Sequence, residues 1–306
     1  MLRGRQLTGA VVLLVVAAGC GGSTSRVGAS SSPFRYDGSQ PLRFVDRGRV
    51  NHGYPIAVDD VSYTAGRDRI SAFLVRPPGK RRRLPAVVYL HGAQGDRSEL
   101  LVPSTWVAAR GAIALTITAP STASPEPSGL KGVRFLRWQV QIQARDVVAV
   151  RRAIDLLSRR KDVDPGRIGF VGWSAGARTG GILAGVEPRL RAIVLMSGGA
   201  APVSAYASVA RPSQRAAILR YLGGIDPLRY LARAKGSLLL EDGLHDRIVP
   251  RSALLTFADA TPKSARISWY EADHQLNNRA YRDGLAFLAE QLRIAGPPVP
   301  GAVTGP

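Results

Sequence analysis

Cysteine is almost absent from this chain, and its absence limits the chemistry that is open to the protein. The 306 residues include one cysteine, Cys20, so no disulfide can form within the chain and no cluster of thiolates can hold a metal. The sequence also lacks a His-Glu-x-x-His segment and a phosphate-cradling glycine loop, which are typical of zinc hydrolases and nucleotide-binding proteins. We therefore expect no metal and no cofactor.

Acidic residues are scarce as well. The chain has 22 Asp and Glu against 42 Lys and Arg, a formal net charge of +20. Such an excess suits an anionic partner, but the basic residues are scattered, and the run Lys80–Arg83 falls in an expected loop. We expect no nucleic-acid partner and favour attraction to an anionic membrane or wall polymer.

The chain begins with one short apolar run. Arg3 and Arg5 precede residues 10–18, which are too few to span a bilayer and form the apolar part of a signal peptide. The run ends in Ala-Ala-Gly-Cys20, which resembles a bacterial lipobox. We expect signal peptide 1–19 to be removed and Cys20 to carry diacylglycerol at the outer face of a bacterial cytoplasmic membrane. The alternative is an ordinary secretory signal with an incidental cysteine.

After a polar tether and linker (20–52, of which 34–52 partly packs on the domain), apolar runs of strand type alternate with helical patterns. The expected strands are 56–63, 70–75, 86–90, 112–118, 168–171, 192–196, 237–240 and 267–270. Helical stripes cover 147–157 and 281–292. This alternation predicts one α/β domain, 53–295, with a mostly parallel, doubly wound sheet. Residues 199–236 are expected to form a short helical cap, and residues 296–306 a flexible tail.

The strand at 168–171 leads into Gly172-Trp-Ser-Ala-Gly176. Gly-x-Ser-x-Gly after a strand and before a helix is the pattern of a nucleophile elbow, a turn so sharp that the serine hydroxyl is exposed at its tip. A helix N-terminus beside the serine offers free N–H groups to a developing oxyanion. Ser174 is therefore the candidate nucleophile.

Asp246 and His274 follow Ser174 in the chain, and this order is similar to that of the α/β-hydrolase superfamily. Within it, the chain resembles the branch of dienelactone hydrolases, acetyl-xylan esterases and prolyl-oligopeptidase catalytic domains, over about residues 56–294. More specific matches are Val163-Asp-Pro-Gly-Arg-Ile-Gly169 and Asp226-Pro-Leu228. Two features differ: dienelactone hydrolase proper uses cysteine where this chain has serine, and no segment is long enough for the propeller of prolyl oligopeptidases.

The resemblance implies a role for each site residue. His274 would be the general base, whereas His52, His91 and His245 fall elsewhere in the pattern. The acid would be Asp246, which matches the family spacing Gly-x-x-Asp-x-x-Val-Pro, although Asp242 and Asp273 lie near the same loops. The oxyanion hole would use the backbone N–H groups of Ala93 and Ala175, with Gln94 as a possible substitute for Ala93.

These observations predict an exported, membrane-anchored serine hydrolase that acts on small carboxylic esters through an acyl-enzyme. One alternative is a serine peptidase of the prolyl-oligopeptidase type. Another is a non-catalytic envelope lipoprotein that uses the fold as a binding scaffold. The natural substrate and the oligomeric state are left open by the sequence.

Overall fold

The computed structural model describes residues 32–79, 83–124 and 126–295. The predicted signal peptide, Cys20, the tail 296–306 and most of the run Lys80–Arg83 lie outside these residues. The described chain forms one nine-stranded sheet in the order β1-β2-β3-β5-β4-β6-β7-β8-β9. The strands are β1 Val45–Arg49, β2 Ala57–Ala65, β3 Asp68–Arg76, β4 Leu84–Leu90, β5 Ile113–Ile117, β6 Val163–Trp173, β7 Leu190–Met196, β8 Ser237–Gly243 and β9 Arg266–Tyr270.

The sheet changes from antiparallel to parallel along its width. Strands β1, β2, β3 and β5 pair antiparallel, whereas β5, β4, β6, β7, β8 and β9 pair parallel. The central strands β4, β5 and β7 are almost wholly buried because helices cover both of their faces, whereas the edge strand β9 is partly exposed. All eight strands expected from the apolar runs are present, so the predicted α/β architecture is confirmed.

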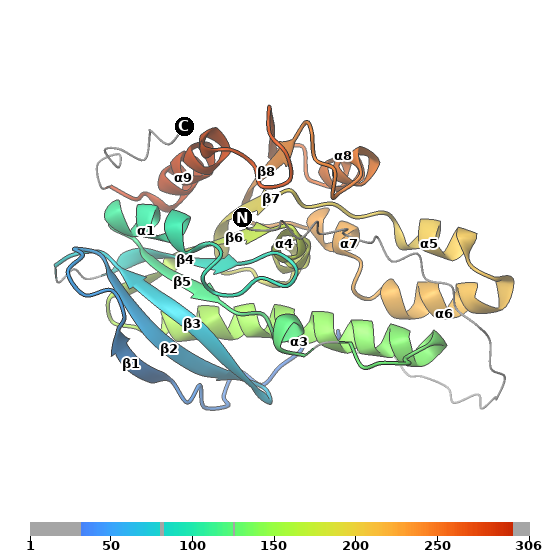
Figure 1. Cartoon of the computed structure of the whole chain (residues 1–306), viewed down its shortest axis with the longest axis horizontal. Helices are drawn as coiled ribbons and strands as arrows, with labels where there is room; N and C mark the ends of the chain where they lie inside the picture. The colour runs from blue at the N-terminus through green and yellow to red at the C-terminus, as the bar shows by residue number, and fades with distance from the viewer. Residues whose placement is uncertain (1–31, 80–82, 125, 296–306) are drawn as a thin grey trace, which may run out of the picture.

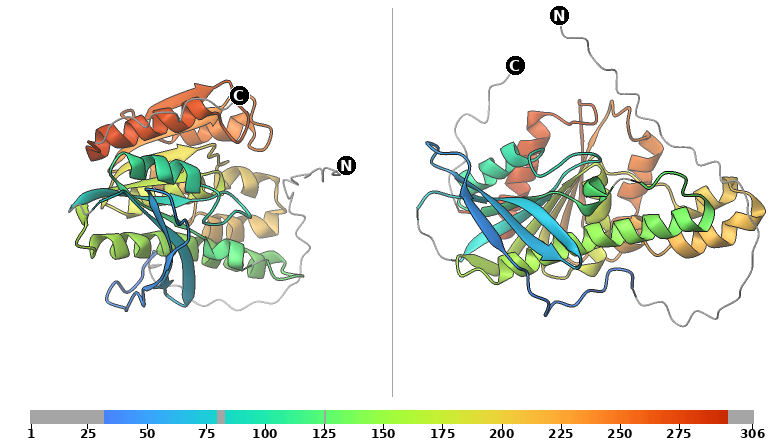
Figure 2. Two further views of the ribbon diagram at one scale, coloured as in Figure 1. Left: turned by 60° about the vertical axis from the view of Figure 1, so that its left-hand side comes forward. Right: turned by 60° about the horizontal axis from the view of Figure 1, so that its bottom comes forward.

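The helices sit in two layers around the sheet (Figures 1 and 2). Helices α1 and α9 pack on one face and share an apolar core with it. Helices α3, α4, α7 and α8 contribute to the core on the other face. The helices are α1 Leu101–Ala109, α2 Pro120–Ala123, α3 Gly132–Ser158, α4 Ala175–Val186, α5 Val203–Val209, α6 Pro212–Leu222, α7 Pro227–Leu231, α8 Arg251–Asp259 and α9 Asn278–Leu292.

The segment predicted as a linker is more ordered than its composition suggests. It contains strand β1 and the side chain of Phe34, which is 1% exposed. The guanidinium of Arg152, 2% exposed on α3, donates hydrogen bonds to the carbonyl oxygens of Gly38 and Gln40 and pairs with Asp155. The buried guanidinium of Arg152 therefore holds this segment against α3. No local sequence pattern predicts this contact.

The predicted helical segment 199–236 forms α5, α6 and α7. Helices α5 and α6 extend alongside the first turns of α3 and project beyond the sheet (Figures 1 and 2). A small apolar cluster holds them there, built from Leu136 on α3, Ala207 on α5 and Ile218 on α6.

Candidate active site

Ser174 sits on a strained turn between β6 and α4. Its φ of 55° and ψ of −113° lie outside the regions that residues with a side chain favour. Its neighbours explain why small residues flank the turn: a Cβ at Gly172 would lie 2.4 Å from the carbonyl oxygen of Gly176. A Cβ at Gly176 would lie 2.2 Å from the carbonyl oxygen of Leu90. Only glycine allows this close approach, and the serine side chain is left half-buried at the tip.

Three side chains from three loops form one hydrogen-bonded chain at the carboxyl edge of the sheet. The Oγ of Ser174, after β6, lies 2.9 Å from Nε2 of His274. The Nδ1 of His274, after β9, lies 2.8 Å from Oδ2 of Asp246, after β8. A carboxylate can only accept a hydrogen bond, so Nδ1 carries the hydrogen and donates it to Asp246, while the unprotonated Nε2 accepts a hydrogen bond from the serine hydroxyl. The predicted Ser174, Asp246 and His274 are thus brought together in the arrangement that activates a serine.

Asp242 lies near the end of β8 and Asp246 lies in the loop that follows it, and their carboxyl groups have different surroundings. The Asp246 side chain is 1% exposed, and its Oδ1 accepts hydrogen bonds from the backbone N–H groups of Ile248 and Val249. Asp242 is 1% exposed, and neither of its carboxyl oxygens has a hydrogen-bond partner among the described residues. Burial, with the nearby charge of Asp246, raises the pKa of Asp242 to about 8. Asp242 is therefore a neutral acid at the end of β8 and does not contact His274.

The loop that carries His274 is anchored by contacts that sequence reasoning missed. The backbone carbonyl of His274 accepts hydrogen bonds from Nε1 of Trp173 (2.9 Å) and from Oγ of Ser197 (2.8 Å). The Trp173 ring also packs against the imidazole, with ring centroids 5.2 Å apart. Ser197 directly follows β7 and has a φ of 50°. In the sequence, the position of Ser197 directly after an apolar strand was the only feature that could have suggested its role in holding the His274 loop.

The two predicted oxyanion donors belong to segments that touch each other. The start of α4 packs against the end of β4, because a Cβ added at Gly176 would lie closest to the carbonyl oxygen of Leu90. Gly92 lies beside Ser174, since a Cβ there would be 3.4 Å from the serine Cβ. Ala93 and Ala175 flank these glycines and are both exposed. Gln94, the possible substitute, is exposed with a φ of 63°.

The remaining described histidines lie outside this chain of hydrogen bonds. The buried His91 donates from Nδ1 to the carbonyl oxygen of Gly92 (2.6 Å), and its Nε2 accepts from the N–H of Ala119 (2.9 Å). Burial lowers the pKa of His91, so it stays neutral and joins the loops after β4 and β5. His245 is exposed and contacts Glu271, and His52 is exposed in the N-terminal segment.

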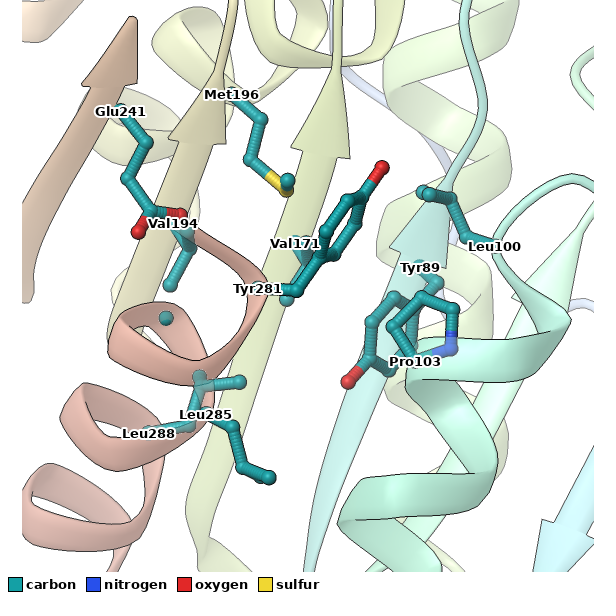
Figure 3. A pocket seen from close by; sticks show the side chains of 11 residues that line it. Tyr89, Leu100, Pro103, Val171, Val194, Met196, Glu241, Tyr281, Leu285 and Leu288 are labelled. Carbon is teal, nitrogen blue, oxygen red and sulfur yellow. The ribbon is translucent and has the colours of Figure 1, made fainter. Parts of the chain in front are cut away.

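A small cavity lies on the face of the sheet covered by α1 and α9 (Figure 3). Its walls are mostly apolar, and the side chain of Glu241 points toward it from β8. Oε1 of Glu241 accepts a hydrogen bond from the hydroxyl of Tyr270, while Oε2 has no partner among the described residues. Burial raises the pKa of Glu241 to about 8. Neither Ser174 nor His274 lines this cavity, so it is separate from the reacting groups.

The described residues contain no group of three or more His, Cys, Asp or Glu side chains that could hold a metal ion. Among them, no helix combines the length and the apolar character needed to cross a membrane.

Comparison with solved structures identifies the fold. An acetyl xylan esterase from a Paenibacillus species superposes with a TM-score of 0.70 at 22% identity, covering 82% of this chain and 90% of the other. Acetyl xylan esterase 1 from a Thermoanaerobacterium species gives 0.70 at 18% identity, with coverage of 84% and 89%. Est1E from Butyrivibrio proteoclasticus gives 0.60 at 15% identity, with coverage of 76% and 98%.

This chain therefore has the α/β-hydrolase fold, as the sequence predicted. At these identities the likeness establishes the fold and leaves the activity to be argued from the site. No family model matches the chain, and no curated protein matches its sequence.

Proposed function

We propose that this protein is a serine hydrolase that cleaves carboxylic esters through an acyl-enzyme intermediate. The observation that carries the proposal is the continuous hydrogen-bonded chain from Ser174 through His274 to Asp246, with the serine on a strained elbow. The names of similar folds support the ester class, because they include acetyl xylan esterases.

In the proposed reaction, Oγ of Ser174 attacks the ester carbonyl while Nε2 of His274 takes the hydroxyl proton. The backbone N–H groups of Ala93 and Ala175 stabilise the oxyanion of the tetrahedral intermediate. His274 then gives its proton to the leaving alcohol, and the C–O bond of the ester breaks. Water, deprotonated by His274, attacks the acyl-serine, the carboxylic acid leaves, and His274 returns the proton to Oγ of Ser174. Asp246 keeps the imidazole in the required tautomer throughout.

Labelling with a fluorophosphonate tests the nucleophile directly, because this probe phosphonylates an activated serine hydroxyl. We expect labelling of the wild type and none of Ser174→Ala. Ser204→Ala, which removes an exposed hydroxyl on α5, is the matched control and should label like the wild type. Equal labelling of Ser174→Ala would contradict the assignment, and absence of labelling in the wild type would favour a non-catalytic scaffold.

We also propose that the protein is exported and held at the outer face of a bacterial cytoplasmic membrane by a diacylated Cys20. The support is the short apolar run that ends in Ala-Ala-Gly-Cys. Two or more acyl chains give stable anchoring where one chain binds only weakly. Mass spectrometry of the protein from the membrane fraction should show Cys20 as a lipid-modified N-terminus. An unmodified N-terminus, or complete release into the medium, would overturn this proposal.

A further inference from the structure

One end of the molecule carries two segments that are rich in basic residues. We call this the basic arm and define it as residues 131–142, the start of α3, with α5 and α6 over 203–222. The views agree that the start of α3 and the connection between α5 and α6 lie at the same end of the molecule (Figures 1 and 2). Neither sequence range contains Asp or Glu. Its six cations are Lys131, Arg134, Arg137, Arg211, Arg215 and Arg220.

The charge of the basic arm is not neutralised by contacts within the protein. Across the described ranges, the ion pairs found elsewhere in the structure include none of these six side chains. Three of them contact neutral groups. Arg137 donates to the hydroxyl of Tyr221, Arg215 donates to the carbonyl oxygens of Ser208 and Ala210, and Arg220 lies over the Tyr221 ring. All six residues are exposed, so their charge faces outward.

Exposed apolar side chains lie among these cations. Val209, at the end of α5, is 85% exposed, and among the described large apolar residues it is the most exposed. Tyr206 is 50% exposed, Leu219 49% and Val133 42%. Apolar side chains that project from a basic helical surface are typical of segments that lie at a membrane interface, where the aliphatic and aromatic groups enter the headgroup region.

We propose that the basic arm docks on the surface of an anionic lipid bilayer. Arginine and lysine would contact the lipid phosphates, and Val209 with its apolar neighbours would insert between the headgroups. A nucleic-acid site is the competing assignment for such charge, but phosphate-backbone binding gains nothing from an exposed valine at the tip of a projecting hairpin. This docking is independent of the proposed catalysis and of lipidation at Cys20.

Binding of the full chain should be measured to phosphatidylcholine vesicles with and without phosphatidylglycerol. For each variant, the affinity for the anionic vesicles is divided by the affinity for the neutral ones. The N-terminal apolar run is the same in every variant and contributes to both affinities, so its contribution cancels in this ratio. The arm variant is Lys131→Gln/Arg134→Gln/Arg211→Gln. The control, Arg159→Gln/Lys161→Gln/Arg191→Gln, removes the same charge from exposed residues near the far end of α3. Each basic side chain at an anionic surface contributes roughly fivefold, so we expect the arm variant to reduce the ratio about 100-fold.

A second pair of variants tests insertion of the apolar tip. Val209→Ser should weaken binding to anionic vesicles several-fold, whereas Val102→Ser, at a residue that is 61% exposed on α1, should not. The charge effect should also disappear at high salt. Equal losses in the arm and control variants would overturn the proposal. So would loss of binding to duplex DNA in the arm variant with vesicle binding intact, because the arm would then be a nucleic-acid site.

Discussion

Two carboxyl groups four positions apart on one segment differ in their immediate contacts. Asp246 accepts three hydrogen bonds, from His274 and from two backbone N–H groups. Asp242 has no hydrogen-bond partner among the described residues and is held neutral by burial. The sequence favoured Asp246 through its match to the family spacing, and the contacts of the two side chains show the physical difference between them.

Asp246→Asn should reduce turnover of a small ester about 10³–10⁴-fold while leaving the fold intact, because the amide no longer holds His274 in the tautomer that accepts the serine proton. Asp242→Asn should leave turnover within a few-fold of the wild type. Steady-state kinetics with a nitrophenyl ester measures both. Similar losses in the two variants would mean that Asp242 also orients His274, together with Asp246.

Asp242 should also make stability depend on pH. Its pKa is about 8 in the folded protein, above the ordinary 3.8, so between these values the folded state binds a proton that the unfolded chain releases. The free energy of unfolding should therefore fall as pH rises from about 4 to about 8. Asp242→Asn should remove this part of the pH dependence and raise stability at pH 8 by about 1–3 kcal/mol.

Urea denaturation at a series of pH values measures that effect. Asp259→Asn, at an exposed residue on α8, is the control and should leave the pH profile unchanged. Glu241 has a similarly raised pKa, so some dependence should persist in Asp242→Asn. A profile identical to the wild type in Asp242→Asn would show that its carboxyl group is ionised in the folded state.

At the scale of elements, the elbow depends on the contact between the start of α4 and the end of β4. Gly176→Ala should destabilise the protein by about 1–3 kcal/mol and reduce turnover, because the added methyl would meet the carbonyl oxygen of Leu90 at 2.2 Å and push α4 outward. Gly38→Ala is the control, since its nearest neighbour, on the Tyr36 ring, is 3.9 Å away. Thermal unfolding and ester kinetics together test this, and a neutral Gly176→Ala would show that α4 can shift without disturbing Ser174.

Elements with a regular pattern were predictable from the sequence, and those held by distant contacts were not. The apolar runs of β4, β5, β6 and β7 reflect burial on two faces, which is a local property of the sequence. Strand β1 is mostly exposed and pairs with β2 at the edge of the sheet, so it carries little apolar pattern. The burial of Arg152 against Gly38 and Gln40 depends on residues more than 100 positions apart, which no local window of sequence contains.

At the scale of the whole molecule, the short connection that forms α5, α6 and α7 bears on substrate size. We expect activity on small activated esters with a preference for short acyl chains, because this connection is short and α5 and α6 pack alongside α3, which leaves little chain to enclose a long acyl group. Discrimination per methylene in an apolar pocket is only about 1–3 kcal/mol, so the preference should be graded. A nitrophenyl-ester series from acetate to palmitate measures it. Rates that rise toward palmitate would indicate a lipase-like pocket, and faster cleavage of proline-containing amides than of esters would favour the peptidase.

The sequence by itself determined the type of fold and predicted Ser174 as the nucleophile, His274 as the base and Asp246 as the acid. Strand periodicity, the glycines around Ser174 and the order of Ser174, Asp246 and His274 are properties of the linear chain. The tertiary structure decided which carboxylate reaches His274, what anchors that loop, and that cations from α3, α5 and α6 gather in one arm without an acidic partner. The physical reason is that these features depend on burial and on distances between segments far apart in the chain, which exist only once the sheet and its two helical layers have formed.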